Sequence, residues 1–154
     1  ATGTAPTGYL APLISQSAAT PDLLHETGYE YLLDWAHDEQ PIWMKTDQGQ
    51  ILSVPYPQEL NDVPQIMARK READDFARMI LSAFDVHLAE AKKRPVVMGI
   101  ALHPYLMGQA HRFRYLETVL SDLQDRADDS VWFTTPRAIS NCYRALFPPS
   151  LSQL

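Results

Sequence analysis

The sequence has little of several residue types, and each shortage excludes a class of protein or a way of stabilising the fold. It contains one cysteine, Cys142, among 154 residues, so packing and not an intrachain disulfide has to stabilise it, and a reducing compartment is allowed. Its longest apolar run, residues 95–102, is far shorter than the roughly 20 residues that span a bilayer. We therefore expect a cytoplasmic protein with no membrane partner.

Positive charge is also scarce. Lysine and arginine total 13 against 19 acidic residues, which gives a formal net charge of -6 and a pI near 5.2. A chain with this charge lacks the positive field that phosphate backbones attract, so we expect no nucleic-acid partner. Gly-x-Gly-x-x-Gly, a phosphate loop and the Gly-x-Ser-x-Gly elbow are all absent, which excludes nucleotide-binding and serine-hydrolase sites of those types.

Hydrophobic residues make up 45% of the chain, enough for one domain over residues 1–154 that buries roughly 70% of its unfolded surface. Short apolar runs alternate with amphipathic helical patterns, which predicts an α/β fold with a mainly parallel sheet. Strands are expected near residues 8–11, 29–33, 51–54, 96–102 and 131–133.

Helices are expected between these strands. Thr20-Pro21 and Thr135-Pro136 each combine an N-cap with a first-turn proline. Two further helices carry apolar stripes: Phe76, Ile80, Phe84 and Leu88 within residues 72–91, then Leu116, Leu120, Leu123 and Ala127 after Phe113. Residues 37–65 are rich in Pro, Asp and Gln and are expected to form an elaborated loop, and residues 147–154 a tail. Residues 1–8 do not have the pattern of a signal peptide.

A polar residue directly after an apolar strand is a candidate for function, because ligands of parallel α/β folds lie at the carboxyl ends of strands. His103 follows the most apolar predicted strand, and Asp34 follows another. A histidine can donate a proton to a leaving nitrogen when a carboxylate holds its other ring nitrogen, and Asp34 is a candidate for that carboxylate. From spacing alone, a capped structural histidine and a solvated aspartate are favoured over a catalytic pair.

A metal site is not predicted within this chain. Catalytic zinc needs three protein ligands and an open position, and the only tight group of suitable residues is His37, Asp38 and Glu39. Consecutive residues seldom converge on one ion, so we expect this group to be loop charge.

Several segments together resemble the polysaccharide deacetylase (NodB-homology) family. Residues 101–109, ALHPYLMGQ, are followed by Arg112, Leu116 and the segment VWFTTP at 131–136. Upstream, the matching segments are similar to the allantoinase-like and peptidoglycan-deacetylase-like branch, and the resemblance covers residues 8 to about 140. These segments are GYLAP at 8–12, TPDLL at 20–24, Gly28-Tyr29, YLLDW at 31–35 and DEQP at 38–41.

The resemblance implies the C-terminal portion of a (β/α) barrel, incomplete in this chain, that hydrolyses a small amide such as an N-acetyl group on a sugar. It assigns His103 as the general acid on the leaving amine and Asp34 as its supporting carboxylate. Trp35 and Leu102 would shape the acyl pocket, and Tyr9 and Tyr105 are further candidates for substrate contact. The complete enzyme would hold a divalent metal, with zinc as the first candidate, on ligands outside this chain.

The sequence departs from the family pattern in two places. The paired aspartates and the His-x-x-x-His that carry the base and the metal ligands are absent. We expect them before residue 1, in the N-terminal half of a longer parent protein, or in a partner chain. Residues 8–12 also lack the arginine expected in that motif, which weakens the case for a standard chitin-like substrate.

Three hypotheses follow from these observations. The leading one is a homo-oligomeric hydrolase of carbon–nitrogen bonds other than peptide bonds, acting on a carbohydrate or another small amide. A second is a non-catalytic half-barrel, a binding or assembly module that dimerises through its open edge. A third is an allantoinase-like enzyme that hydrolyses a ureide without metal.

Overall fold

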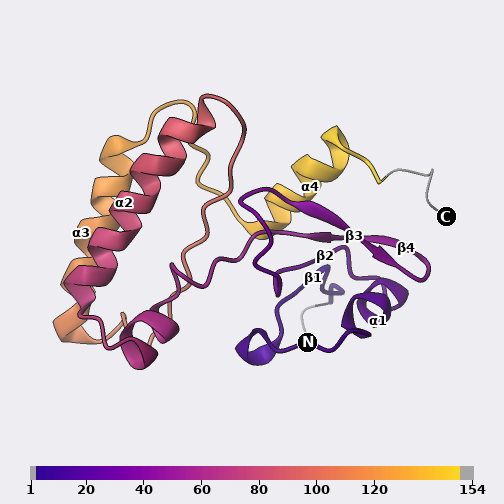
Figure 1. Cartoon of the computed structure of the whole chain (residues 1–154), viewed down its shortest axis with the longest axis horizontal. Coiled ribbons are helices and arrows are strands. Elements are labelled where there is room, and N and C mark those ends of the chain that lie inside the picture. The colour runs from indigo at the N-terminus through magenta and orange to yellow at the C-terminus, as the bar shows by residue number, and fades with distance from the viewer. Residues whose placement is uncertain (1–2, 150–154) are drawn as a thin grey trace. The chain divides into compact units, whose positions relative to one another are not determined.

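The computed structural model describes residues 3–149 of the chain (Figure 1). By their contacts the residues divide into two compact units, Ala1–Pro55 with Phe133–Leu154, and Tyr56–Trp132. The predictions for residues 1–2, and for the part of the tail beyond residue 149, lie outside the described residues.

The first unit is built on a four-stranded sheet with the order β1-β2-β4-β3 (Figure 1). Strands β1, β2 and β4 are parallel, whereas β3 is antiparallel to β4. The register pairs Tyr9 with Leu32 and Leu32 with Ser53, which aligns the carboxyl ends of the parallel strands. The strands are β1 (Gly8–Tyr9), β2 (Tyr31–Leu32), β3 (Ile42–Thr46) and β4 (Gly49–Ser53).

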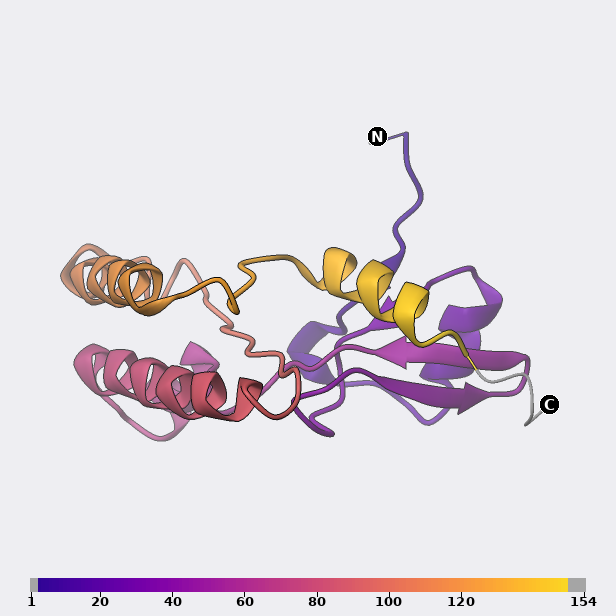
Figure 2. The same ribbon diagram turned by 90° about the horizontal axis from the view of Figure 1, so that it is seen from above.

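Helices α1 (Thr20–Glu26) and α4 (Pro136–Leu146) cover opposite faces of this sheet. Leu32 packs in one cluster with Leu24 of α1, whereas its neighbour Tyr31 packs in another with Tyr143 of α4. Successive strand residues point to opposite faces of a sheet. A strand of two residues can therefore pack one side chain against α1 and the other against α4. Figure 2 shows α4 lying along the sheet. A short 3-10 turn, η1 (Pro12–Ile14), follows β1.

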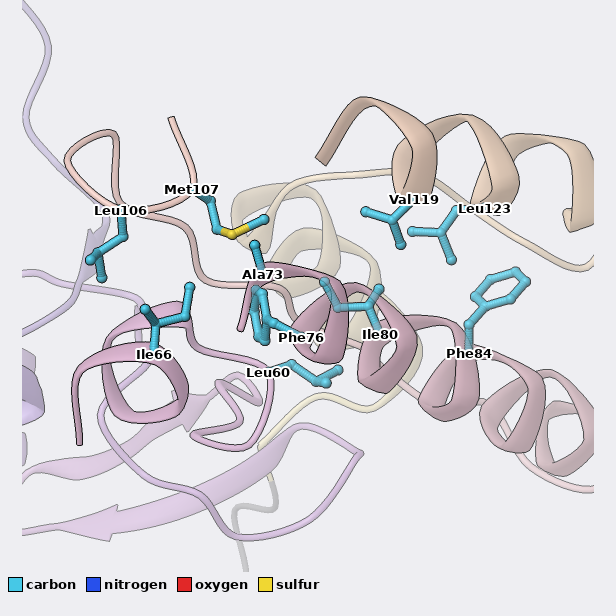
Figure 3. Packing of buried hydrophobic residues seen from close by; sticks show 10 residues of the cluster. All are labelled: Leu60, Ile66, Ala73, Phe76, Ile80, Phe84, Leu106, Met107, Val119 and Leu123. Carbon is cyan, nitrogen blue, oxygen red and sulfur yellow. The ribbon is translucent and has the colours of Figure 1, made fainter. Parts of the chain in front are cut away.

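The second unit is a pair of long helices, α2 (Ala73–Ala91) and α3 (Ala110–Arg126), preceded by a π-helix, η2 (Val63–Ala68). They lie side by side and run in the same direction, since Arg126 near the end of α3 forms an ion pair with Asp85 in the second half of α2. Figure 3 shows Val119 and Leu123 pointing from α3 toward α2. No helix among the described residues is long and apolar enough to cross a membrane.

The helix predictions are largely confirmed, but Thr20 is the first residue of α1 and not its N-cap, which is Ala19. Thr135 caps α4 by accepting a hydrogen bond from the Ala138 backbone N–H at 3.4 Å, and the Phe76 stripe of α2 is buried. The prediction for one residue of the α3 stripe is wrong, because Leu120 is 44% exposed and Val119 is buried in its place. With 3.6 residues per turn, Val119 lies above Leu123 on the face toward α2, and Leu120 is rotated away from it.

The strand predictions are confirmed only in part. The predictions near residues 8–11, 29–33 and 51–54 correspond to β1, β2 and β4. Residues 37–65 are not simply a loop, because they contain the β3–β4 hairpin and the start of η2. The predicted strands at 96–102 and 131–133 are absent. A strand requires a hydrogen-bonded neighbour, and among the described residues only Ala101 of these segments has one, in an isolated parallel bridge to Asn61.

Candidate active site

The site begins at the bridge between Ala101 and Asn61. The backbone N–H of Ala101 donates to the carbonyl of Leu60 at 2.9 Å, and the N–H of Asp62 donates to the carbonyl of Ala101 at 3.1 Å. Asn61 lies two residues before η2, and its side-chain oxygen accepts a hydrogen bond from the Val63 N–H at 3.0 Å. These bonds place Asp62 beside the residues that lead into His103.

Asp62 holds His103 through both of its carboxylate oxygens. Its Oδ1 lies 2.6 Å from the imidazole Nδ1, and its Oδ2 accepts the His103 backbone N–H at 2.8 Å. Asp62 is fully buried, whereas the His103 side chain is 35% exposed. An ionised carboxylate can only accept, so Nδ1 donates in this contact. Nε2 forms no hydrogen bond within residues 3–149 and is therefore the ring nitrogen available for proton transfer.

The residues after His103 form a tight turn that fixes its backbone. The N–H of Leu106 donates to the carbonyl of His103 at 2.9 Å, and the Gln109 side-chain amide donates to the carbonyl of Tyr105 at 2.8 Å. Met107 is fully buried in the core between α2 and α3, which anchors the turn (Figure 3). The position of His103 therefore depends on packing as well as on Asp62.

Gly108 is required for this turn, and we predict that Gly108→Ala disturbs it. A Cβ at this position would lie 2.5 Å from the Pro104 carbonyl oxygen and 2.9 Å from the Pro104 Cα, so backbone would have to move. We expect a loss of about 1–3 kcal/mol in the free energy of unfolding, measured by urea denaturation, and a shifted His103 ring resonance by NMR. His111→Ala, at an exposed helix position, is the control. Unchanged stability and an unchanged ring resonance would contradict the packing described here.

Leu102 and Tyr105, two predicted substrate-binding residues, flank His103 in the chain and are partly exposed. The Tyr105 ring lies 5.4 Å from the His103 ring between centroids, and 56% of Tyr105 is exposed. Tyr56, which the sequence did not indicate, is close enough to Asp62 to be affected by its charge. Burial, and secondly the negative charge of Asp62, raise the pKa of Tyr56, so its hydroxyl stays protonated. The site residues of the second unit thus include one histidine, one carboxylate and two tyrosines, which come from two segments, residues 56–62 and 103–105.

Asp34, the carboxylate predicted to hold His103, does not make the contact with Nδ1, since Asp62 does. Its Oδ1 instead accepts the Ala11 backbone N–H at 2.7 Å, which ties the carboxyl end of β2 to that of β1. Its Oδ2 is buried and has no partner among the described residues. Burial raises the pKa of Asp34, and the Ala11 N–H opposes this shift only in part. A role of Asp34 in catalysis stays a prediction.

The raised pKa gives Asp34 a testable effect on stability. The carboxyl is protonated in both states below its unfolded pKa of about 3.9, and the folded state loses stability as pH rises from there to the higher folded pKa. Asn cannot ionise, so the stability of Asp34→Asn relative to the natural protein should increase as pH rises above about 4, and should level off once pH exceeds the folded pKa. Urea denaturation measures this difference, with the exposed Asp125→Asn as control for net charge. A flat or falling difference would contradict the burial argument.

The two remaining predicted residues lie in the first unit. Trp35 is 37% exposed and stacks on His37, with ring centroids 5.5 Å apart and planes 29° apart. Tyr9 is partly buried and packs edge-on against Tyr29, 5.8 Å between centroids, in the cluster beneath α1. These contacts give Tyr9 a packing role, and substrate binding by either residue stays a prediction.

Sequence reasoning missed Asp62, although a local signal was present. Asn61-Asp62-Val63-Pro64 combines two capping residues with an early proline, which is typical of a helix start. That signal predicts where η2 begins and says nothing about a histidine 41 positions further along the chain.

The described residues of this chain do not fit a metal by themselves. Among residues 3–149 no group of three or more His, Cys, Asp or Glu side chains converges on one point. Asp62 already uses both oxygens on His103, so it is not a spare ligand.

The second unit holds an imidazole fixed by a buried carboxylate. The first unit is a mainly parallel sheet covered by helices, which makes this an α/β protein. Solved structures share this fold. The chain superposes on PuuE allantoinase with a TM-score of 0.87 and 28% identity, over 97% of this chain and 49% of that one. A polysaccharide deacetylase homologue from Pseudomonas aeruginosa PAO1 gives 0.85 and 27%, over 97% and 50%. One from Mycobacterium smegmatis gives 0.77 and 22%, over 99% and 55%, and supports the fold alone.

Sequence comparison agrees with the structures. A polysaccharide deacetylase homologue of Schizosaccharomyces pombe is 31% identical over 127 residues, which is 75% of this chain and 39% of that protein. No protein-family model matches the sequence. The chain is similar in sequence and in structure to polysaccharide deacetylases, the family that its sequence predicts. It spans about half the length of the solved structures and less than half of the yeast relative.

Proposed function

We propose that this chain carries the proton-donating part of a hydrolase that cleaves carbon–nitrogen bonds other than peptide bonds, with an N-acetylated carbohydrate or small amide as substrate. The proposal is supported by the fully buried Asp62, whose two oxygens fix His103 so that Nε2 alone is available to a ligand. Similarity to polysaccharide deacetylases favours amide hydrolysis over other reactions that a carboxylate-held histidine could perform.

The proposed step is the breakdown of the tetrahedral intermediate. The carbon–nitrogen bond breaks while the proton on Nε2 moves to the leaving nitrogen, which departs as a neutral amine and leaves a carboxylic acid. Asp62 stabilises the imidazolium before transfer and keeps Nε2 in place, as a carboxylate does for the histidine of other acid–base pairs. Water is the nucleophile, and we expect its base outside residues 3–149.

The remaining parts of the proposal concern the other half of the enzyme. We propose that this chain forms an incomplete barrel, and that the same protein or a partner chain supplies the rest, including the ligands of a divalent metal. No step above depends on that metal. Asp34, Trp35, Leu102, Tyr9 and Tyr105 remain the proposed additional site residues, and a homo-oligomer remains the proposed assembly.

Acetate release tests the substrate class. The protein as its gene encodes it should release acetate from N-acetylglucosamine oligomers or a simpler N-acetyl amine, and treatment with a chelator should reduce this activity. If neither class of amide is hydrolysed while the protein is folded and assembled, the acetyl-amide proposal is wrong.

The similarity to PuuE allantoinase supports a second candidate function, the hydrolysis of a cyclic ureide. The leaving group would again be a nitrogen, so His103 and Asp62 would act as above. Ring opening of allantoin without acetate release, unaffected by the chelator, would favour this candidate over the first.

A further inference from the structure

The exposed segment between η2 and α2, residues 67–72, carries three consecutive cations, Arg69, Lys70 and Arg71. The chain has a formal net charge of -6, so positive charge gathered in one place stands out from the rest of its surface. None of the three side chains forms an ion pair within residues 3–149. Their charge is therefore available to attract an anionic ligand.

The carboxylates that follow this segment do not cancel its charge. Asp74 and Asp75, in the first turn of α2, both form ion pairs with Arg78, Asp74 at 2.8 Å. Glu72 forms no ion pair among the described residues, so one free carboxylate stands against three cations. Because the first turn of α2 is acidic, an anion would bind to the cationic side chains and not to the end of the helix.

Arg71 is held in place by a buried side chain. Its Nε donates a hydrogen bond to Oε1 of Gln65 at 3.1 Å, and its backbone N–H donates to the carbonyl of Gln65 at 3.0 Å. Gln65 is fully buried, whereas Arg71 is exposed and its two terminal nitrogens form no hydrogen bond within residues 3–149. A guanidinium that is fixed through Nε offers a positioned pair of donors to a carboxylate or another oxyanion.

The cationic segment lies beside the turn that follows His103. Both ends of the segment belong to the same core cluster as that turn. The cluster members concerned, which lie at one end of the cluster in Figure 3, are Ile66, Ala73, Leu106 and Met107. Two residues of chain span at most about 7 Å, so the Cα of Arg71 lies within that distance of the Cα of Ala73. A ligand long enough to extend along this end of the second unit can therefore contact both His103 and Arg71.

We propose that Arg71, with Arg69 and Lys70, binds an oxyanion carried by the substrate, and that the substrate is an acidic N-acetylated glycan. The oxyanion, such as a uronate carboxylate, would belong to a sugar unit beside the one whose amide reacts at His103. This inference rests on the proposed function and adds the charge of the substrate to it. A protein with a net negative charge repels a polyanion, so a local group of cations would also direct such a glycan toward the site.

Binding without turnover tests the proposed oxyanion site. We would titrate the full-length protein with two oligosaccharides of equal length, one of alternating glucuronate and N-acetylglucosamine, the other of neutral N-acetylglucosamine alone. The acidic oligomer should bind at least ~10-fold more tightly at low salt, as expected for a charge-assisted hydrogen bond, and should shift the Arg71 Nε–H resonance in NMR spectra. This preference should decrease as the salt concentration rises.

Three variants show which property of Arg71 matters. Arg71→Met should remove the preference for the acidic oligomer. Arg71→Lys keeps the charge but not the guanidinium held by Gln65, so it should lose most of the preference. Lys93→Met removes the same charge from an exposed position just beyond the other end of α2 and should keep the preference.

Equal affinity for the two oligomers, or a preference that survives Arg71→Met, would overturn the proposal. Inorganic phosphate is the third probe. If phosphate shifts the Arg71 resonance and the acidic oligomer does not, the site takes a free anion and the substrate class is wrong. Acetate release from the same samples keeps the two proposals apart. An Arg71-dependent preference without acetate release would refute the acetyl-amide function alone, whereas acetate release with equal kcat/KM for both oligomers would refute the oxyanion site alone.

Discussion

Replacing His103 by glutamine should lower kcat/KM for amide hydrolysis by about 100- to 10,000-fold, the range that a positioned general acid contributes. Glutamine retains a side chain that can accept a hydrogen bond or donate one to Asp62 but cannot deliver a proton to a leaving nitrogen. The measurement is steady-state kinetics on the full-length protein, with circular dichroism as a check on folding. His111→Gln, at an exposed position of α3, is the matched control and should leave the rate unchanged.

A double-mutant cycle should show that the contribution of Asp62 to the rate of amide hydrolysis depends on His103. Asp62→Asn keeps the shape of the side chain but removes the charge that stabilises the imidazolium, so we expect a smaller loss than for His103→Gln. The double variant should be no slower than His103→Gln alone, because Asp62 acts through the histidine. Asp125→Asn, an exposed carboxylate on α3, is the control. Independent, multiplicative losses would show that Asp62 is not the partner of His103 in catalysis.

Phe76→Ala should cost about 3–5 kcal/mol in the free energy of unfolding, because it leaves a cavity in a core that cannot fully collapse. Phe76 is completely buried and lies in the cluster that joins α2, α3 and the turn after His103 (Figure 3). Urea denaturation followed by circular dichroism measures this loss.

Val86→Ala is the matched control on the same helix. Val86 is 63% exposed, so its truncation should change stability by no more than about 0.5 kcal/mol. If both variants lost similar amounts, burial in this cluster would not be what stabilises the second unit.

The helices were predictable because their signals are local. Thr20-Pro21 and Thr135-Pro136 give the starts of α1 and α4 within a residue, and the spacing of Phe76, Ile80 and Phe84 identifies the buried face of α2. A helix closes its own hydrogen bonds between residues four apart, so the sequence of one segment contains most of the information. The misplaced Leu120 shows the limit, since several apolar residues compete for one face and packing against α2 selects Val119.

The strands were less predictable because a strand depends on its neighbour. Residues 96–102 have the composition of a buried strand, yet the described residues offer them one bridge at Ala101. Residues 42–46 have a weaker strand pattern but form β3, because the turn at Asp47 and Gln48 folds them back on β4, where five residue pairs are in register. The residue composition of a segment indicates only how readily it becomes extended. Whether it forms a strand depends on a second segment with which its backbone can make hydrogen bonds.

The sequence by itself determined that this is an α/β protein similar to polysaccharide deacetylases and that His103 is its first candidate for catalysis. Both conclusions depend on local information, a periodic pattern and a histidine directly after an apolar run. Only the tertiary structure decided that Asp62, and not Asp34, holds the imidazole. That pairing joins residues 41 positions apart through the bridge between Asn61 and Ala101, and such contacts arise only when the chain packs.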